Sequence, residues 1–112
     1  MKELIEKVAE FRDKRNWRKF HTPKNLAISL VIEATELLEM FQWTFDEELE
    51  NVVNAKRDKI EEEIADVLIY LLLLADALNI DLEGAFFKKM EKNEKRYPVE
   101  KAKGKADKYT EL

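Results

Sequence analysis

The amino-acid sequence predicts an all-α protein of four to five helices, and three features indicate this. Hydrophobic residues make up 46% and charged residues 39% of the chain, a composition suited to amphipathic helices. Only two Gly and two Pro occur, so little of the chain is suited to turns. Apolar residues recur at helical spacing along most of the chain. A length of 112 residues suits one domain, spanning residues 1–112.

The two N-terminal helices are indicated by an apolar stripe and by a capping signal. The stripe of the first helix consists of Leu4, Ile5, Val8 and Phe11. We expect this helix to end near Asn16. Thr22 followed by Pro23 is the order of an N-cap and a first helical residue, so the second helix should begin there and continue to about residues 42–43.

A long third helix is predicted from about residue 56 to residue 78, after a short acidic amphipathic stretch over residues 46–54. Its second half is apolar nearly all round, which indicates burial on several sides, within the bundle or between subunits. Asp81 is placed to cap a fourth helix over residues 82–96. Residues 99–112 show no periodicity, so we expect them to form a mobile tail.

Charge, cysteine content and hydropathy limit the classes of function. The chain has no cysteine, which excludes a disulfide framework and a thiolate zinc site. The longest apolar run, over residues 67–75, is far short of the ~20 residues that span a bilayer, and the N-terminus does not resemble a secretory signal. We therefore expect a cytoplasmic protein without a membrane partner. The formal charge of -4 argues against nucleic acid polymers as partners, although residues 88–108 are locally basic enough to face a polyanion.

Two pairs of carboxylates carry the strongest chemical signal. Glu33 and Glu36 are three residues apart on the second helix, and Glu63 and Asp66 repeat this spacing on the third. The intervening segment allows the third helix to return antiparallel to the second, which would bring the four acids together. Because four such carboxylates repel one another, we expect a hard divalent cation between them, with Mg²⁺ as the usual choice beside phosphate oxygens.

Acidic residues at this spacing are also common on solvated helix faces, so the pairs alone are weak evidence. Their neighbours strengthen the metal interpretation. Glu33 lies between two apolar residues, and Asp66 directly precedes the apolar run of the third helix, which is an unusual place for a solvated charge. Glu61 and Glu62, by contrast, have the pattern of ordinary exposed acids.

Polar residues on two helices could serve a phosphorylated ligand. Tyr70 follows Asp66 by four residues, so its hydroxyl should lie along the acidic stripe. On the fourth helix, Lys89, Asn93 and Arg96 recur at helical spacing, and Tyr97 extends this basic stripe. Such a stripe is usually a solvated face. Opposite a metal site it would supply the cations and donors that a triphosphate needs.

Trp17 and Trp43 flank the second helix and have two interpretations. Core or interface packing is the common role of tryptophan. Alternatively, the two indoles would hold a nucleobase between them, because every base offers a π face. The single histidine, His21, is expected to belong to a turn and to bond backbone near the start of the second helix, with no role as a ligand or base.

An ordered set of residues resembles a known family. The set consists of both carboxylate pairs, Asn25 with Leu26, Phe41 to Trp43, the run from Lys89 to Pro98, and the ending from Lys108 to Leu112. It resembles the MazG-like all-α nucleoside triphosphate pyrophosphohydrolases, and most of all their dCTP pyrophosphatase branch. The resemblance extends from about Phe11 to the last residue.

The resemblance implies a helical bundle, assembled as a dimer or tetramer, that hydrolyses a nucleoside triphosphate such as dCTP to monophosphate and pyrophosphate. It implies that Glu33, Glu36, Glu63 and Asp66 are the Mg²⁺ ligands and catalytic residues. It further implies a set of substrate contacts, with the tryptophans at the base and the others at sugar and phosphates: Trp17, Asn25, Trp43, Tyr70, Lys89, Asn93, Arg96 and Tyr97. Vertebrate members differ by a histidine near the base where this chain has Val8.

Two other classes of protein are alternatives. A carboxylate-bridged di-iron bundle needs two Glu-x-x-His motifs, and the chain has only one histidine, outside any such motif. A non-catalytic helical adaptor would use the acids as surface charges and residues 71–74 as a binding seam for a partner. A pyrophosphohydrolase with a broader or different nucleotide preference also fits the sequence.

Overall fold

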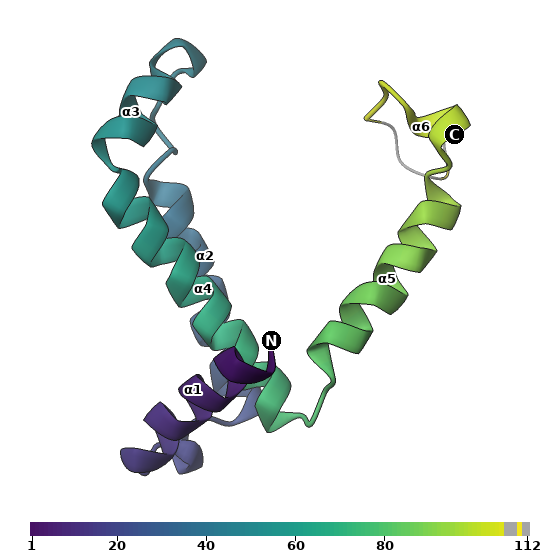
Figure 1. The fold of residues 1–112 in the computed structure, drawn as a ribbon. Helices are drawn as coiled ribbons and strands as arrows, with labels where there is room; N and C mark the ends of the chain where they lie inside the picture. The colour runs from purple at the N-terminus through teal and green to yellow at the C-terminus, as the bar shows by residue number, and fades with distance from the viewer. Residues whose placement is uncertain (107–109, 111–112) are drawn as a thin grey trace. The chain divides into compact units, whose positions relative to one another are not determined.

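The computed structural model describes residues 1–106 and 110, and within these residues it contains helices and turns but no strand. The all-α prediction is confirmed. The helices are α1 (Lys2–Lys14), α2 (Pro23–Glu39), α3 (Leu49–Ala55), α4 (Arg57–Ala77), α5 (Leu82–Arg96) and α6 (Val99–Ala102), with short 3-10 helices η1 (Arg18–Phe20) and η2 (Asp46–Glu48) (Figure 1). They form two compact units, Met1–Ile80 and Asp81–Leu112.

The junction between α1 and α2 follows the expected signals. Asn16 adopts a left-handed backbone conformation with φ 55°, which ends the first helical segment. The Thr22 hydroxyl accepts a hydrogen bond of 3.2 Å from the backbone N–H of Asn25, so Thr22 is the N-cap of α2, with Pro23 as the first helical residue. The Asn25 side-chain amide donates to the Phe20 carbonyl at 3.1 Å. These bonds fix the loop that carries Trp17 and His21 against the start of α2.

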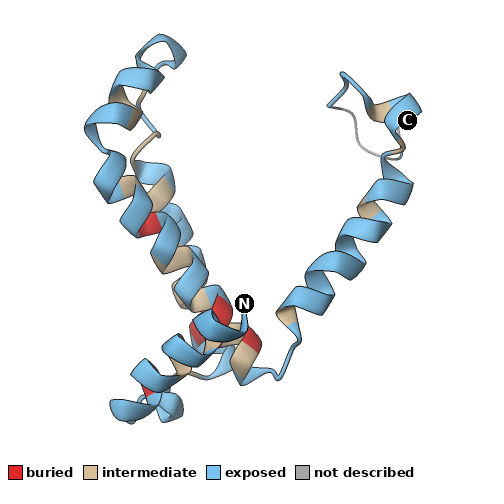
Figure 2. Cartoon of the chain, in the orientation of Figure 1, coloured by how far each residue is buried: buried red, intermediate tan, exposed pale blue. Residues whose placement is uncertain are grey.

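In the first unit α2 and α4 lie side by side and run antiparallel, as the spacing of the carboxylate pairs requires (Figure 1). Helix α1 packs against α4. The apolar core is small and consists of Leu26, Leu72, Leu73 and Ala75 (Figure 2). Helix α2 ends at Glu39, a few residues before the predicted end, because the chain turns over residues 40–43 toward η2.

A buried arginine forms an ion pair that joins α1 to the C-terminal end of α4. Arg12 is only 3% exposed, and its guanidinium donates to Asp76 at 2.8 Å and to Asp13 at 2.9 Å. Removing a guanidinium from water is costly unless carboxylates accept its hydrogen bonds. Arg12 is therefore stable only where Asp13 and Asp76 accept them, which fixes its position. Arg12 therefore determines how α1 sits on α4.

Many apolar side chains of the first unit remain exposed in the single chain. On α2 these residues are Ile28, Val31, Ile32 and Leu38, and on α4 they include Ile64, Leu68, Ile69 and Leu71. The apolar half of α4 is thus only partly covered, by α1 and α2. Burial of α4 on several sides, within the bundle or between subunits, stays a prediction.

The second unit begins as predicted. Asn79 has φ 53°, and Asp81 caps α5 by accepting a bond of 3.0 Å from the N–H of Gly84. The expectation of a mobile tail from residue 99 was wrong for Val99–Ala102, which form α6 after Pro98. Pro98 supports this short helix because its fixed φ suits the residue before a first turn. Residues 107–109 and 111–112, most of the C-terminal family ending, lie outside the described residues. Within the described part, no helix is long and apolar enough to cross a bilayer.

Candidate metal centre

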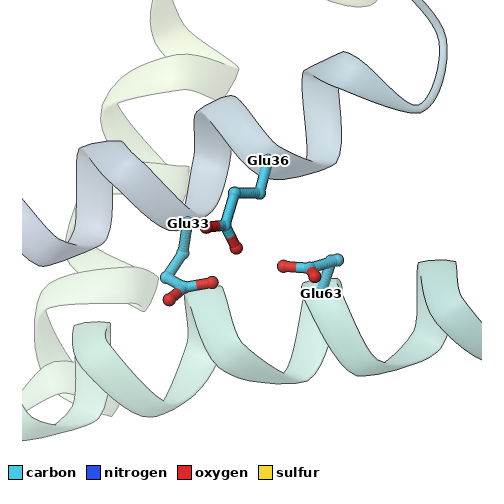
Figure 3. A group of neighbouring side chains, drawn as sticks. All are labelled: Glu33, Glu36 and Glu63. Atoms are coloured by element: carbon cyan, nitrogen blue, oxygen red, sulfur yellow. The ribbon is translucent and has the colours of Figure 1, made fainter.

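Three of the four predicted ligands meet between α2 and α4. Glu33 and Glu36 project from successive turns of α2, and Glu63 projects toward them from α4 (Figure 3). One carboxylate oxygen from each lies within 4.8 Å of the others. The three-residue spacing on α2 and the antiparallel packing of α4 together produce this cluster.

Burial leaves two oxygens of the cluster without partners. Glu63 is 7% exposed, and the Oε2 atoms of Glu33 and Glu63 are buried and accept no hydrogen bond within the described residues. Ionised carboxylates only accept hydrogen bonds, so they cannot satisfy one another. Burial, followed by the neighbouring Glu36, Asp66 and Glu63 carboxyl groups, raises the pKa of Glu33 to about 7.

The donor set fits a hard divalent cation. All the contacting atoms are carboxylate oxygens, the ligands that Mg²⁺ and Ca²⁺ prefer. A cation would give the buried Oε2 atoms of Glu33 and Glu63 a partner and would remove the repulsion that raises the Glu33 pKa. A positive charge between α2 and α4 would therefore stabilise the arrangement.

Asp66 lies one turn beyond Glu63 on α4 and is half-buried. It is outside the three-residue set, but its charge contributes to the raised pKa of Glu33, so it borders the cluster. Glu61 and Glu62 are exposed, as predicted, and Glu61 pairs with Arg57 at 3.6 Å. The structure thus separates the buried acids of α4 from its solvated ones.

A cavity of about 310 Å³ lies between α1 and α4, further along α4 from the acids. Trp17 and Tyr70 line it together with Lys7, Val8, Phe11, Arg12, His21, Ile69 and Leu73. The Trp17 and Phe11 rings meet edge to face, with centroids 5.8 Å apart. The volume is at the lower end of the range for small-molecule pockets, and a mostly apolar wall with a few polar groups is typical of them.

His21 and Arg12 were missed as cavity residues by sequence reasoning. The imidazole does not make the expected bond to backbone: its Nδ1 is buried without a partner within the described residues, and its ring lies 6.3 Å from that of Trp17. Burial, followed by the Arg12 charge, lowers the pKa of His21. A signal for Arg12 was present, because it follows Val8 by four residues and so falls on the apolar stripe of α1.

The remaining predicted contacts are Trp43 and the polar residues of α5. Trp43 is 84% exposed and follows the C-terminal end of α2, whereas Trp17 precedes its N-terminal end. A helix of 17 residues is about 25 Å long, so one chain cannot place both indoles on one base. The basic stripe forms on α5, where Lys89 is exposed and Asn93 half-buried, and it continues through Arg96 to Tyr97.

Comparison with known proteins gives consistent matches. The chain matches the MazG-like family over residues 28–112. It is 45% identical over 106 residues to dCTP pyrophosphatase 1 of Bos taurus, covering 93% of this chain and 63% of that protein. It is 44% identical to the human protein of the same name, of which it spans 62%.

A solved structure is also similar. The crystal structure of a pyrophosphatase from Archaeoglobus fulgidus is 55% identical, with a TM-score of 0.83, over 88% of this chain and 92% of that one. The family match covers both carboxylate pairs, most of α2 and the whole of α5. On this evidence the chain belongs to the MazG-like family.

Proposed function

We propose that this protein is a Mg²⁺-dependent nucleoside triphosphate pyrophosphohydrolase that converts dCTP and water to dCMP and pyrophosphate. The observation that carries the proposal is the cluster of Glu33, Glu36 and Glu63 with its two buried, unpartnered oxygens. The relatives named dCTP pyrophosphatase 1 support the choice of reaction and of nucleotide. The structure described as a pyrophosphatase supports the same class of reaction.

The position of the cavity supports a nucleotide substrate. Tyr70 lies seven residues after Glu63 on α4, which corresponds to about 10 Å along the helix axis. A nucleotide whose phosphates are held at the acids would therefore extend its base into the cavity lined by Trp17 and Tyr70. Trp17 offers an aromatic face for stacking, and its neighbour His21 offers ring nitrogens to the base.

In the proposed reaction an oxygen of water forms a bond to phosphorus in line with the leaving group, and the bond to the departing pyrophosphate breaks. A bound Mg²⁺ supplies charge stabilisation at the phosphoryl oxygens and lowers the pKa of a water molecule. Glu33, Glu36, Glu63 and Asp66 would hold the ion. Glu33 or Glu36 is our choice for the carboxylate that orients the water and accepts its proton, since both are close to Glu63. The α5 residues Lys89, Asn93 and Arg96 would contact phosphate oxygens.

We further propose that the enzyme is a homo-oligomer, a dimer or tetramer, acting in the cytoplasm. The exposed apolar residues of α2 and α4 support self-association. Because Trp17 and Trp43 are at opposite ends of α2, Trp43 would reach the base only of a nucleotide bound to another copy. The family match extends over both compact units, which supports treating residues 1–112 as one domain.

Pyrophosphate release from a panel of ribo- and deoxynucleoside triphosphates, with and without Mg²⁺, tests the proposal. We expect dCTP to be the preferred substrate, dCMP and pyrophosphate to be the products, and EDTA to stop the reaction. Glu62→Gln serves as a control at an exposed acid next to the site. No hydrolysis of any nucleotide would favour the adaptor alternative, and preference for another nucleotide would overturn only the choice of substrate.

A further inference from the structure

A second cavity, of about 380 Å³, adjoins the acid cluster on the side away from Trp17. It is lined by Glu36, Glu39, Met40, Lys56, Lys59 and Glu63. Two of these residues, Glu36 and Glu63, belong to the candidate metal centre. Glu63 is more than nine-tenths buried, its Oε2 has no partner within the described residues, and the cavity borders this residue.

The two lysines of this cavity have no assigned role, and both are exposed. Within the described part of the chain, neither Lys56 nor Lys59 forms an ion pair. Arg57 lies between them in sequence but outside the lining, and it pairs with Glu61 at 3.6 Å. The ammonium groups of Lys56 and Lys59 could therefore bind an anion beside the acid cluster. Their neighbour Arg57 forms a solvent-exposed ion pair with Glu61 instead.

Residues along α4 follow the order of groups in a nucleoside triphosphate. Lys59 precedes Glu63 by four residues, about 6 Å along the axis, and Tyr70 follows Glu63 by seven residues. The first end of α4 is thus cationic, the middle carries the metal ligands, and the later part borders the aromatic cavity. The N-terminal end of a helix also favours anions, which reinforces the two lysines.

We propose that Lys56 and Lys59 form a binding site for the terminal diphosphate of the substrate, and hence for the pyrophosphate product. This inference deepens the proposed function and rests on it for the identity of the ligand. The ammonium groups would donate to phosphate oxygens on the side of the metal opposite the base. Glu39 is the only carboxylate of the lining outside the metal cluster, so with a cation held by the cluster the two lysines outnumber the one remaining acid of the lining.

Calorimetric titration of the full chain with inorganic pyrophosphate in saturating Mg²⁺ tests the site. We expect Lys56→Gln and Lys59→Gln each to weaken binding by about 10-fold and the double variant by about 100-fold, the loss of one or two charge-assisted hydrogen bonds. Lys59→Arg should retain most of the affinity, because it keeps the charge. Binding of dCMP should be unchanged in all of them.

Arg57→Gln is the matched control, since it removes the same charge from the same helix end but lies outside the cavity. An equal loss in Arg57→Gln, or no loss in the double variant, would overturn the diphosphate site. Hydrolysis by the unaltered protein is assayed separately. If the unaltered protein cleaves nucleotides while the double variant binds pyrophosphate normally, only the diphosphate site is wrong. If it cleaves none while the lysines are still needed for pyrophosphate, the proposed function is wrong and the site stands.

Discussion

Glu63 shows at the scale of a single residue why this cluster is more than a group of surface acids. It is 7% exposed, and its Oε2 has no partner among the described residues. A buried carboxylate without hydrogen bonds or a cation is strongly disfavoured. Such a group therefore needs a compensating interaction, and a cation shared with Glu33 and Glu36 would supply it.

Glu63→Gln should reduce hydrolysis at least about 100-fold, because it removes a charged metal ligand. Substitution of residues that only hydrogen-bond to metal ligands typically lowers activity by about 10–100-fold. Without metal the variant should be at least as stable as the parent, since it removes repulsion and its amide can donate to the neighbouring acids. Pyrophosphate release and thermal unfolding in EDTA measure the two effects. Asp66→Asn should behave similarly, and near-normal activity in both would place the metal elsewhere.

The raised pKa of Glu33 predicts a pH dependence of stability in the absence of metal. In the folded protein the pKa is about 7, against an ordinary value of 4.5. The folded state thus binds the proton more tightly than the unfolded state, so this contribution to stability is present below pH 4.5 and is lost as the pH rises to about 7.

Urea unfolding in EDTA across this pH range measures the effect. The free energy of unfolding should fall with rising pH in the parent, and the fall should be smaller in Glu33→Gln. Added Mg²⁺ should restore stability most at the upper end of the range, because the cation replaces the proton. A parent protein whose stability does not fall, or a variant with the same slope as the parent, would contradict the assignment to Glu33.

Trp17 lines the cavity between α1 and α4. Trp17→Ala should therefore weaken dCTP binding by about one to two orders of magnitude, because that is the usual effect of losing one stacking contact. Binding of dCTP to the parent should also quench tryptophan fluorescence. Phe20→Ala is a control at an exposed aromatic ring of the same loop. The base site would be misplaced if Trp17→Ala bound dCTP as well as the parent.

At the scale of the element, the position of α1 depends on Arg12. Its guanidinium joins α1 to Asp76 near the end of α4, and its neighbours on α1 line the aromatic cavity. Arg12→Ala should lower the free energy of unfolding by about 2–3 kcal/mol, the loss of charged hydrogen bonds to a partly exposed partner. Chemical denaturation measures this value.

Asp76→Asn is the companion variant, and it should cost less because an amide oxygen still accepts a bond from Arg12. Loss of the Arg12 contact should also raise the KM for dCTP more than it lowers kcat, since the cavity wall shifts while the acids stay in place. A change in stability of less than about 0.5 kcal/mol in Arg12→Ala, the range of ordinary surface substitutions, would show that α1 is held by apolar packing alone.

At the scale of the whole molecule, the small core of one chain is the main feature to explain. Its buried apolar residues are Leu26, Leu72, Leu73 and Ala75, whereas Val31 is 64% and Ile32 51% exposed. Exposed apolar surface on adjacent helices favours association with another surface. We expect analytical ultracentrifugation at micromolar concentration to show a dimer or tetramer, and a monomer would contradict this.

Ile32→Glu tests whether α2 is part of that interface. In a monomer the residue is half exposed, so the substitution should change stability little. In an oligomer it would place a charge in an apolar contact, and the assembly should shift to a smaller species with a lower melting temperature. Lys24→Glu, at an exposed polar position of the same helix, should leave the sedimentation unchanged.

The sequence by itself predicted the longer helices, the caps of α2 and α5, and the pair of acids on one side of α2. Thr22 with Pro23, and Asp81, carry their start signals locally, within one turn, so α2 and α5 were predicted at their observed first residues. Helical spacing likewise put Glu33 beside Glu36. The end of α2 and the short helix α6 were not predicted, because ends without Gly or a side-chain cap leave little local signal.

Only the tertiary structure decided which residues meet across helices. It brought Glu63 into contact range of the α2 acids and left Asp66 at the border, a difference of one turn that helical spacing cannot resolve. It placed Arg12 and His21 in the cavity with Trp17 and separated Trp43 from it by the length of α2. Spacing along a helix is local geometry, whereas distances between helices depend on the packing of α1, α2 and α4, which no short stretch of sequence encodes.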